Sequence, residues 1–407
     1  MRLYLFDDRV ADGWAPFALT RPCSELLFGD RLLRRRLERY AGTPAAGLMT
    51  RPWLGAYREE ETPPVVDRSI REQEERLFLC SRFVPAAGAR FEPPERASTL
   101  WIEGEAVGAW LPAEVPGPEP AWFRQPEALP GTGEVELAGD LLSAAWELIS
   151  RNPDRLEADL AARAGGPDAP PPVQAPPRGA EIVGGGRVEL GGDVRVEPGV
   201  LIDTREGPVC LDEGVEVLAG TRLSGPLYAG RSSRLLGGAL ATVSAGPRSY
   251  LRGEVESTVV WGYSNKAHDG YLGHSYVGRW VNLGALTTNS DLKNNYRPVR
   301  IPGPEGEEVQ TGLLKLGCLV GDHVKTGIGM LLNTGTLIGA GSNLFGEMPP
   351  RRVPPFSWGG GETLGTHRKE QFLRTAEVVA GRRGVPFDET TRRWLGAVWE
   401  AGRAPSG

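Results

Sequence analysis

The sequence lacks the features that carry a chain to or through a membrane. No apolar run among its 407 residues approaches the length that spans a bilayer. The opening segment, MRLYLFDDRV, has no long apolar core and turns acidic at once, which is not typical of a signal peptide. We therefore expect a cytoplasmic protein without a membrane span.

Cysteine is also scarce, and the sequence has no excess of positive charge. The four cysteines lie far apart and show no Cys-x-x-Cys spacing, which speaks against a disulfide framework and a zinc site. They are Cys23, Cys80, Cys210 and Cys318, and we expect buried free thiols. The formal net charge of −6 gives no reason to expect a nucleic-acid partner, which would need a basic face.

Glycine and proline are abundant instead, and the change of pattern along the chain predicts four parts. These are an α/β domain over residues 1–164, a Pro-rich linker over 165–180, a repetitive domain over 181–345, and a loop with helices over 346–407. In the first part, the apolar spacing predicts strands at Leu3–Phe6, Leu77–Val84 and Leu100–Glu103, and helices over Asp30–Tyr40 and over Asp140–Ala164, the latter broken at Pro153.

The third part repeats with a period of six. Val188, Val194 and Val200 are spaced in this way, and a later series is Val320, Thr326, Leu332 and Ile338. Each member of that later series is followed by Gly or Asn, which favour the positive φ of a tight turn. The repeat is typical of a left-handed parallel β-helix, in which branched residues fill a triangular prism. A β-sandwich with chance spacing is the alternative. Helices predicted at Thr366–Arg382 and Asp388–Arg403 would cap or flank the prism.

Lysine, asparagine and histidine are rare elsewhere but gather in the β-helix. Four of the five lysines, seven of the eight asparagines and three of the four histidines fall between Asn265 and Asn343. The hexad rhythm also stops between Thr287 and Thr311, where a polar loop leaves the scaffold. The loop offers Asn289, Asp291, Lys293, Asn294, Asn295 and Arg297. This cluster predicts a ligand site for hydroxyls and phosphate, whereas turn preference alone would explain only some of the asparagines.

Acyl transfer from a thioester needs a base for the acceptor's proton and donors for the oxyanion. Histidine is the usual base near neutral pH, and His268, beside Asp269, is the strongest candidate. A zinc site is the competing hypothesis. The spacing of His268, His274 and His323 does not match the close pair with a distant third ligand of the zinc-binding β-helix enzymes.

The segment Gly262–Tyr296 resembles the acetyltransferase site of the bifunctional N-acetylglucosamine-1-phosphate uridyltransferase/glucosamine-1-phosphate acetyltransferase family. It is closer to a related group of bacterial sugar-nucleotidyltransferase-like proteins. That group shares the early Thr20–Arg21–Pro22, the Trp146–Ile149 stretch and the late run Gly321–Gly346, so the resemblance to it covers about residues 1–360.

The resemblance implies roles for individual residues. His268 would be the base for the amino group, and Tyr271 and Asn282 would contact the sugar phosphate. The further substrate-binding candidates are Lys266, Asn289, Asp291, Lys293, Asn294 and Arg297. Acetyl-CoA would lie along Ala285, Gly321, Asp322, Lys325, Thr326 and Ala340. The family assembles as trimers, which implies a homotrimer.

The N-terminal part departs from the family. Residues 11–22, ADGWAPFALTRP, stand where related nucleotidyltransferases have a glycine-rich loop that cradles phosphates, so only Thr20 and Arg21 remain as nucleotide-binding candidates there. Asp7 and Asp8 could bind Mg²⁺. On the β-helix, Ser257 and Thr258 stand near the family's lysine pair, and Arg297 replaces its loop-end lysine.

Three functions follow as hypotheses. The first is acetyl transfer from acetyl-CoA to an amino-sugar phosphate on the β-helix, with nucleotidyl transfer to a sugar 1-phosphate in the N-terminal domain as a second activity. The second is a sugar-1-phosphate nucleotidyltransferase, using UTP or dTTP, whose β-helix serves only oligomerisation or regulation. The third is a trimeric binding scaffold without catalysis.

Overall fold

The computed structural model describes residues 1–68, 74–163, 176–303 and 305–403. Two compact units divide the chain. Unit 1 contains residues 1–26, 31–145 and 387–407, and unit 2 contains residues 27–30 and 146–386. The predicted linker lies mostly outside the described residues. The boundaries of these units differ from those of the four predicted parts, and the predicted domain boundaries stay a prediction.

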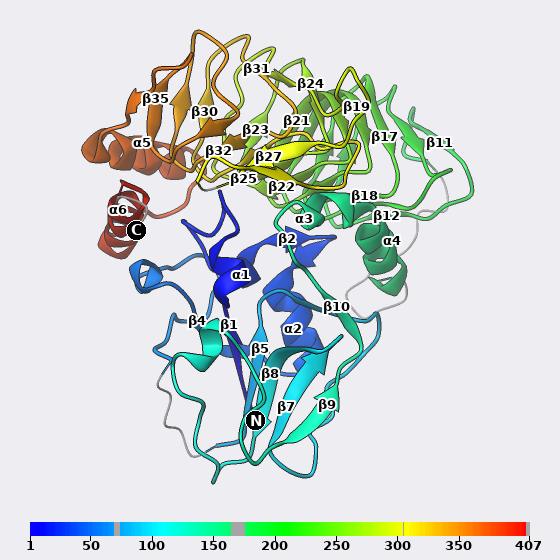
Figure 1. Cartoon of the computed structure of the whole chain (residues 1–407). Helices are drawn as coiled ribbons and strands as arrows, with labels where there is room; N and C mark the ends of the chain where they lie inside the picture. The colour runs from blue at the N-terminus through cyan, green and yellow to red at the C-terminus, as the bar shows by residue number, and fades with distance from the viewer. Residues whose placement is uncertain (69–73, 164–175, 304, 404–407) are drawn as a thin grey trace. The chain divides into compact units, whose positions relative to one another are not determined.

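Unit 1 is built on a six-stranded mixed sheet (Figure 1). Its order is β4 (Ala45–Met49), β1 (Arg2–Phe6), β5 (Arg76–Cys80), β8 (Glu105–Leu111), β7 (Ser98–Ile102) and β9 (Gly133–Glu136). The first three strands are parallel, and β1 is buried from Leu3 to Phe6, as expected of a strand covered on both faces. The three strand predictions for this domain therefore fall on β1, on β5 with the separate β6 (Phe83–Pro85), and on β7.

Two helices in this region begin later in the chain than the sequence predicted. Helix α2 covers Leu33–Ala41 and ends at Gly42, which has φ of 69°, whereas its predicted first residues Arg31–Leu32 form strand β3. Residues Gly139–Leu141 form strand β10, which pairs with β6, so helix begins only with α3 (Glu147–Ser150). Strand pairing outweighed the local helical spacing at both places.

Unit 2 is a parallel β-helix, which confirms the central prediction from the hexad repeat. One face of the prism is a nine-stranded parallel stack, β12-β15-β18-β20-β22-β25-β29-β32-β34, that runs from Val188–Leu190 to Arg352–Val353. A single core of buried Val, Leu and Ile side chains fills the prism. Parallel pairs stack residues of equivalent register, for example Leu251 on Lys266 and Val255 on Leu272.

Two helices cover parts of the β-helix. Pro153 lies at the second position of α4 (Asn152–Arg163), where its missing N–H costs no hydrogen bond, and Leu156 of this helix packs against Tyr228. Helix α5 (Lys369–Arg382) flanks one corner of the prism, as predicted. Its Phe372 ring lies 5.6 Å from the ring of His323 and 5.0 Å from that of Phe356.

The last helix is part of the other unit. Helix α6 (Glu389–Arg403) belongs to unit 1, where Trp394 donates a hydrogen bond to the Thr20 carbonyl oxygen (3.2 Å) and packs edge-on against Tyr57. The sequence showed two amphipathic helices, but it did not show which surface each one covers. No helix in the described ranges combines the length and apolar character that crossing a membrane requires.

Candidate active site

A polar face forms on the β-helix where three successive coils meet. Strand β21 (Tyr250–Glu256) ends at Glu256, β24 (Tyr271–Gly273) begins at Tyr271, and Asp291 follows β26 (Thr288–Asn289). The Tyr271 hydroxyl donates to Asp291 Oδ2 at 2.7 Å and lies 3.4 Å from Glu256 Oε2. Alternating strand residues point outward, so these polar groups face away from the core.

His274 completes this face and was absent from the residues assigned from the sequence. Its Nδ1 lies 2.7 Å from Asp291 Oδ2, the oxygen that also accepts from Tyr271. The side chain of His274 is 18% exposed. Burial alone would raise the pKa of Asp291, but the hydrogen bonds from His274 and Tyr271 outweigh it and lower that pKa. Burial and the Asp291 carboxylate together raise the pKa of Tyr271.

The signal that could have identified His274 was the clustering of histidines. His274 directly follows β24, but its partner Asp291 is 17 residues further along the chain. Only the stacking of coils brings these two together. Glu256 and Lys315 were missed for the same reason, and their side chains form an ion pair of 3.6 Å beside Tyr271.

His268 is exposed at the corner of the coil that precedes β24. Its carbonyl oxygen accepts a hydrogen bond from Lys266 Nζ, and the neighbouring Asp269 pairs with Arg252 at 3.0 Å. No side chain of the described residues hydrogen bonds to the His268 imidazole. The geometry therefore presents this ring to solvent, as a base for an incoming substrate requires, but nothing orients it.

Lys266, predicted to contact substrate, lies inside the β-helix. It shares the register of the core residue Leu251 and is 2% exposed. Its ammonium donates to the carbonyl oxygens of Arg252 (3.1 Å) and His268. Burial lowers the pKa of Lys266 to about 8. Its contacts hold the His268 corner against the preceding coil, and the buried side chain offers a ligand little surface.

The predicted loop residues separate into two groups. Asn289 is 3% exposed, and its amide bonds to both N and O of Gly273, so it joins neighbouring coils. The exposed loop residues are Asn294, Asn295 and Arg297. Asn282 is also exposed, and its side chain is bonded to that of Asn265. Lys293 Nζ donates to the Pro298 carbonyl oxygen at 3.2 Å.

Most of the residues predicted to line acetyl-CoA are buried within the chain. Asp322 Oδ1 accepts from the Arg279 backbone N–H at 2.7 Å, and Thr326 Oγ1 accepts from that of Gly284 at 2.9 Å. Ala340 is 1% exposed, and Gly321 is buried as well. Lys325 donates to the carbonyl oxygens of Trp280 and His323, and burial lowers its pKa to about 7. Ala285 is half-buried.

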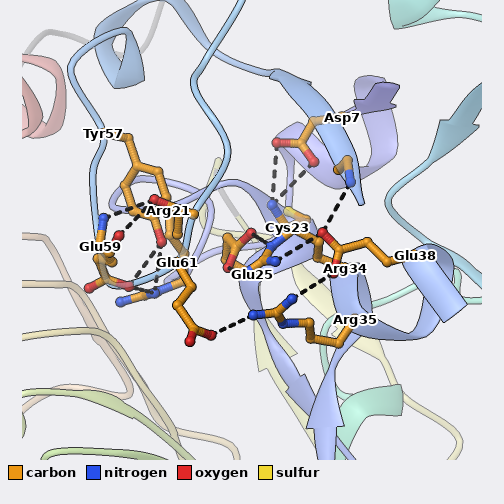
Figure 2. Close-up of polar contacts among 12 residues, drawn as sticks. Asp7, Arg21, Cys23, Glu25, Arg34, Arg35, Glu38, Tyr57, Glu59 and Glu61 are labelled. Atoms are coloured by element: carbon orange, nitrogen blue, oxygen red, sulfur yellow. Dashed lines mark hydrogen bonds and ion pairs between the residues drawn. The ribbon is translucent and has the colours of Figure 1, made fainter. Parts of the chain in front are cut away.

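The candidate magnesium ligands of unit 1 are engaged by protein donors. Asp7 accepts from the Cys23 N–H (3.1 Å), the Ser81 hydroxyl (2.6 Å) and the Thr50 hydroxyl (2.5 Å), and Arg51 lies 3.1 Å away. Figure 2 shows the Asp7 carboxylate turned to Cys23. These donors occupy the lone pairs that a metal ion would use.

Asp8 is engaged in the same way. It accepts from the Ala11 N–H at 2.8 Å, which caps α1 (Arg9–Asp12), and it pairs with Arg82 at 2.6 Å. In the part of the chain that the structure describes, no group of three or more His, Cys, Asp or Glu side chains could hold a metal ion. The residues present therefore do not fit Mg²⁺ at Asp7 and Asp8.

The Thr20–Arg21–Pro22 motif is also built into the interior of unit 1. Arg21 is 1% exposed, and its guanidinium pairs with Glu59 at 2.8 Å, close to Tyr57 (Figure 2). Thr20 is 2% exposed, and its hydroxyl lies 3.2 Å from the Phe17 carbonyl oxygen. The motif contributes to folding through a buried ion pair, and nucleotide binding by it stays a prediction.

Comparison with known proteins supports the resemblance found in the sequence. Residues 3–166 match the model of a family described as sugar nucleotidyl transferase. A bifunctional sugar-1-phosphate nucleotidylyltransferase/acetyltransferase from Sulfurisphaera tokodaii is 30% identical over 154 residues, which are 34% of this chain and 36% of the relative. The bifunctional protein GlmU of Syntrophomonas wolfei is 28% identical over 188 residues, 41% of this chain and 38% of that one.

Both matches span little more than a third of the relatives' length. The family model and the Sulfurisphaera tokodaii relative are named as transferases, which confirms the predicted resemblance at modest identity. Among solved structures, an Arabidopsis UDP-N-acetylglucosamine acyltransferase aligns with 49% of this chain and 76% of its own, at 14% identity and a TM-score of 0.24. A TM-score that low supports no inference.

Proposed function

We propose that the β-helix transfers an acyl group from acetyl-CoA to the amino group of a sugar phosphate. The observation that carries the proposal is the polar face of Tyr271, Asp291, Glu256 and His274, with His268 exposed at the preceding corner. Two carboxylates beside a hydroxyl suit a cationic amino group, and exposed imidazoles can take its protons. The acetyltransferase activity in the name of the Sulfurisphaera tokodaii relative supports the same reaction.

In this proposal His268 is the base that deprotonates the attacking nitrogen. Tyr271, Asn282 and the exposed loop residues Asn294 and Arg297 contact the sugar phosphate. Ala285 and Lys325 are the most accessible of the residues proposed for acetyl-CoA. Lys266 and Asn289 act indirectly, because they hold the coils that carry the contacts. A cytoplasmic location stays a prediction.

The test measures release of the CoA thiol when the purified full chain receives acetyl-CoA and glucosamine 1-phosphate or another amino-sugar phosphate. We expect turnover that falls by about 100-fold or more in His268→Asn, the usual loss when a general base is removed. Glu181→Gln, an exposed change in β11 (Glu181–Val183) at the start of the same unit, should keep wild-type activity. Absence of turnover with every amino-sugar phosphate would reject the proposal.

Nucleotidyl transfer by unit 1 is a second candidate because the family model covers residues 3–166. It predicts pyrophosphate release from UTP or dTTP with a sugar 1-phosphate, and loss of that release in Arg21→Ala. Removing one partner of a buried ion pair costs about 3–5 kcal/mol, so the melting temperature of the variant must be measured beside its activity.

If neither nucleotides nor CoA compounds raise the melting temperature of the wild type, a binding scaffold without catalysis is favoured.

We also propose a homotrimer. Several large apolar side chains are exposed near the later coils: Leu286, Ile328, Leu331, Phe345, Met348 and Trp358. Ile328 is 81% exposed, and hydrogen bonding between Gly329 N and Ala285 O places its turn next to that of Leu286. An apolar surface of this kind is typical of contact with other copies of a chain.

A further inference from the structure

Two histidines flank Tyr271 on one short stretch of chain. His268 lies three residues before it and His274 three residues after it. The His274 imidazole and the Tyr271 hydroxyl each lie 2.7 Å from Asp291 Oδ2, so His274 is near any group held at that hydroxyl. Three extended residues span at most about 10 Å, which limits the distance between the backbones of His268 and Tyr271. The proposed function uses only His268, which leaves open what the better-anchored His274 does.

Hydrogen bonding orients His274 and sets its tautomer. Asp291 has a lowered pKa and is therefore ionised near neutral pH, so it can only accept hydrogen bonds. Nδ1 of His274, at 2.7 Å, must then carry the proton, which leaves the lone pair of Nε2 free to accept another. This is the arrangement of a general base held by a carboxylate. The Tyr271 hydroxyl donates to the same oxygen and fixes Asp291 in turn.

The chemistry of the proposed reaction requires two proton acceptors. An amine in water at neutral pH is an ammonium ion with three hydrogens on nitrogen, whereas the amide product retains one. The first proton must leave before the nitrogen has a lone pair to attack. The second leaves as the N–C bond forms and the C–S bond breaks, and it ends on the thiolate of CoA. One proton is therefore released to water for each acyl group transferred.

We propose that His274, oriented by Asp291, takes the first of these protons from the bound ammonium group and passes it to water. His268 then takes the second proton and returns it to the departing thiolate. Asp291 and Tyr271 are positioning residues for His274 in this scheme. The inference rests on the proposed function, because it assigns a step in the same acyl transfer.

The surroundings of His274 favour this role. The charged or titratable groups that face it are Asp291, Tyr271, Glu256 and Lys315. Lys315 is balanced by Glu256 at 3.6 Å, so the negative charge of Asp291 remains to attract an ammonium group. The partial exposure of His274 gives its proton a path to water. His274 has φ of 45°, a conformation that asparagine tolerates well, so His274→Asn is a suitable replacement.

The experiment measures kcat/KM for acetyl transfer to an amino-sugar phosphate from pH 6 to 9.5 in the wild type and three variants. At pH 7, kcat/KM of His274→Asn should be about 100-fold below that of the wild type. Above the pKa of the acceptor's own ammonium group, the substrate is already a free amine in solution. There, kcat/KM of His274→Asn should be within about threefold of the wild-type value. His268→Asn should remain low at every pH, because the second proton still needs its base. Asp291→Asn should follow the profile of His274→Asn.

Asp203→Asn is the matched control, since it removes a carboxylate that is held by Arg205 and Arg222 elsewhere on the β-helix. It should leave the pH profile unchanged, and melting temperatures should show that every variant is folded. A wild-type profile in folded His274→Asn would overturn this inference while the proposed function survives. Absence of wild-type turnover at every pH would reject both together.

Discussion

Two lysines with buried ammonium groups are the most unusual individual residues of the β-helix. Lys266 and Lys325 each donate to two backbone carbonyl oxygens, and burial lowers the pKa of both. The sequence indicated that lysines gather here, and a polar ligand site was the natural interpretation. For Lys266 the structure gives a different physical role, because its ammonium joins two coils from the inside.

Replacing Lys266 should change how stability depends on pH. Its pKa is about 8 in the folded chain and 10.5 ordinarily, so the unfolded state binds more protons between these values. The free energy of unfolding of the wild type should therefore rise across this window, by at most about 3 kcal/mol from this residue. Lys266→Met should lack that part of the rise when urea unfolding is measured at each pH.

Lys325→Met offers a matched comparison. The pKa of Lys325 is about 7, so its contribution to the free energy of unfolding should start to rise about one pH unit lower than that of Lys266. Lys325→Met should lack this contribution. At pH values below the folded pKa of the lysine, and above its ordinary pKa of 10.5, the free energy of unfolding of each variant should change with pH as that of the wild type does. Parallel curves through the whole window from pH 7 to 10.5 would contradict the burial of these ammonium groups.

At the scale of elements, the turns between strands decide how closely the coils approach. The hexad spacing predicted that turns recur every six residues in the late coils, but it placed the positive φ at the wrong residues. Positive φ occurs at Gly329, Gly335 and Gly341, each two residues after the Gly or Asn that was expected to have it. A bend inside strand β21 shows the same physical requirement. Gly253 has φ of 94°, and a Cβ there would lie 2.7 Å from the Gly270 carbonyl oxygen of the next coil. A side chain at this position would force the coils apart.

Gly253→Ala should therefore lower the free energy of unfolding by about 3 kcal/mol, because it combines backbone strain with a clash against backbone. Gly381→Ala is the matched control in α5, where a Cβ meets nothing within 4 Å. It should raise the free energy of unfolding by about 0.5–1 kcal/mol, since alanine favours helix. Urea unfolding measures the free energy of unfolding of both variants. Equal values for Gly253→Ala and Gly381→Ala would contradict the close approach of the coils at Gly253.

At the scale of the whole molecule, the exposed apolar side chains of the later coils have no explanation within one chain. The predicted homotrimer would cover them. Ile328 is the most informative of these residues because it is 81% exposed and a change there costs one isolated chain little. The oligomeric state can thus be tested separately from folding.

Ile328→Glu should convert the protein to single chains, because burying a carboxylate in an apolar contact is costly. The mass in solution, measured by light scattering during gel filtration, should fall from three times that of one chain to that of one chain. Val378→Glu is the control, since Val378 is 58% exposed on α5 and is not one of the apolar residues proposed to lie in the trimer contact, so it should keep the wild-type mass. A wild type that is a single chain would reject the homotrimer.

The sequence by itself determined the β-helix, because a period of six with branched residues and turn glycines is local information that each coil repeats. It also predicted a ligand site in one segment, where polar residues that are rare elsewhere gather, and that site stays a prediction. The sequence did not predict which segments pair as strands or which unit each helix packs in. Residues Gly139–Leu141 became a strand through β6, and α6 joined unit 1.

Only the tertiary structure decided which polar residues work together. His274 and Asp291 are 17 residues apart and meet because consecutive coils stack, whereas Lys266 turns inward at a register that its neighbours in sequence do not reveal. The same stacking buried Asp322 and Thr326 and left His268 exposed. Contacts between coils depend on register and on side-chain direction, which are properties of the folded prism and not of any single repeat.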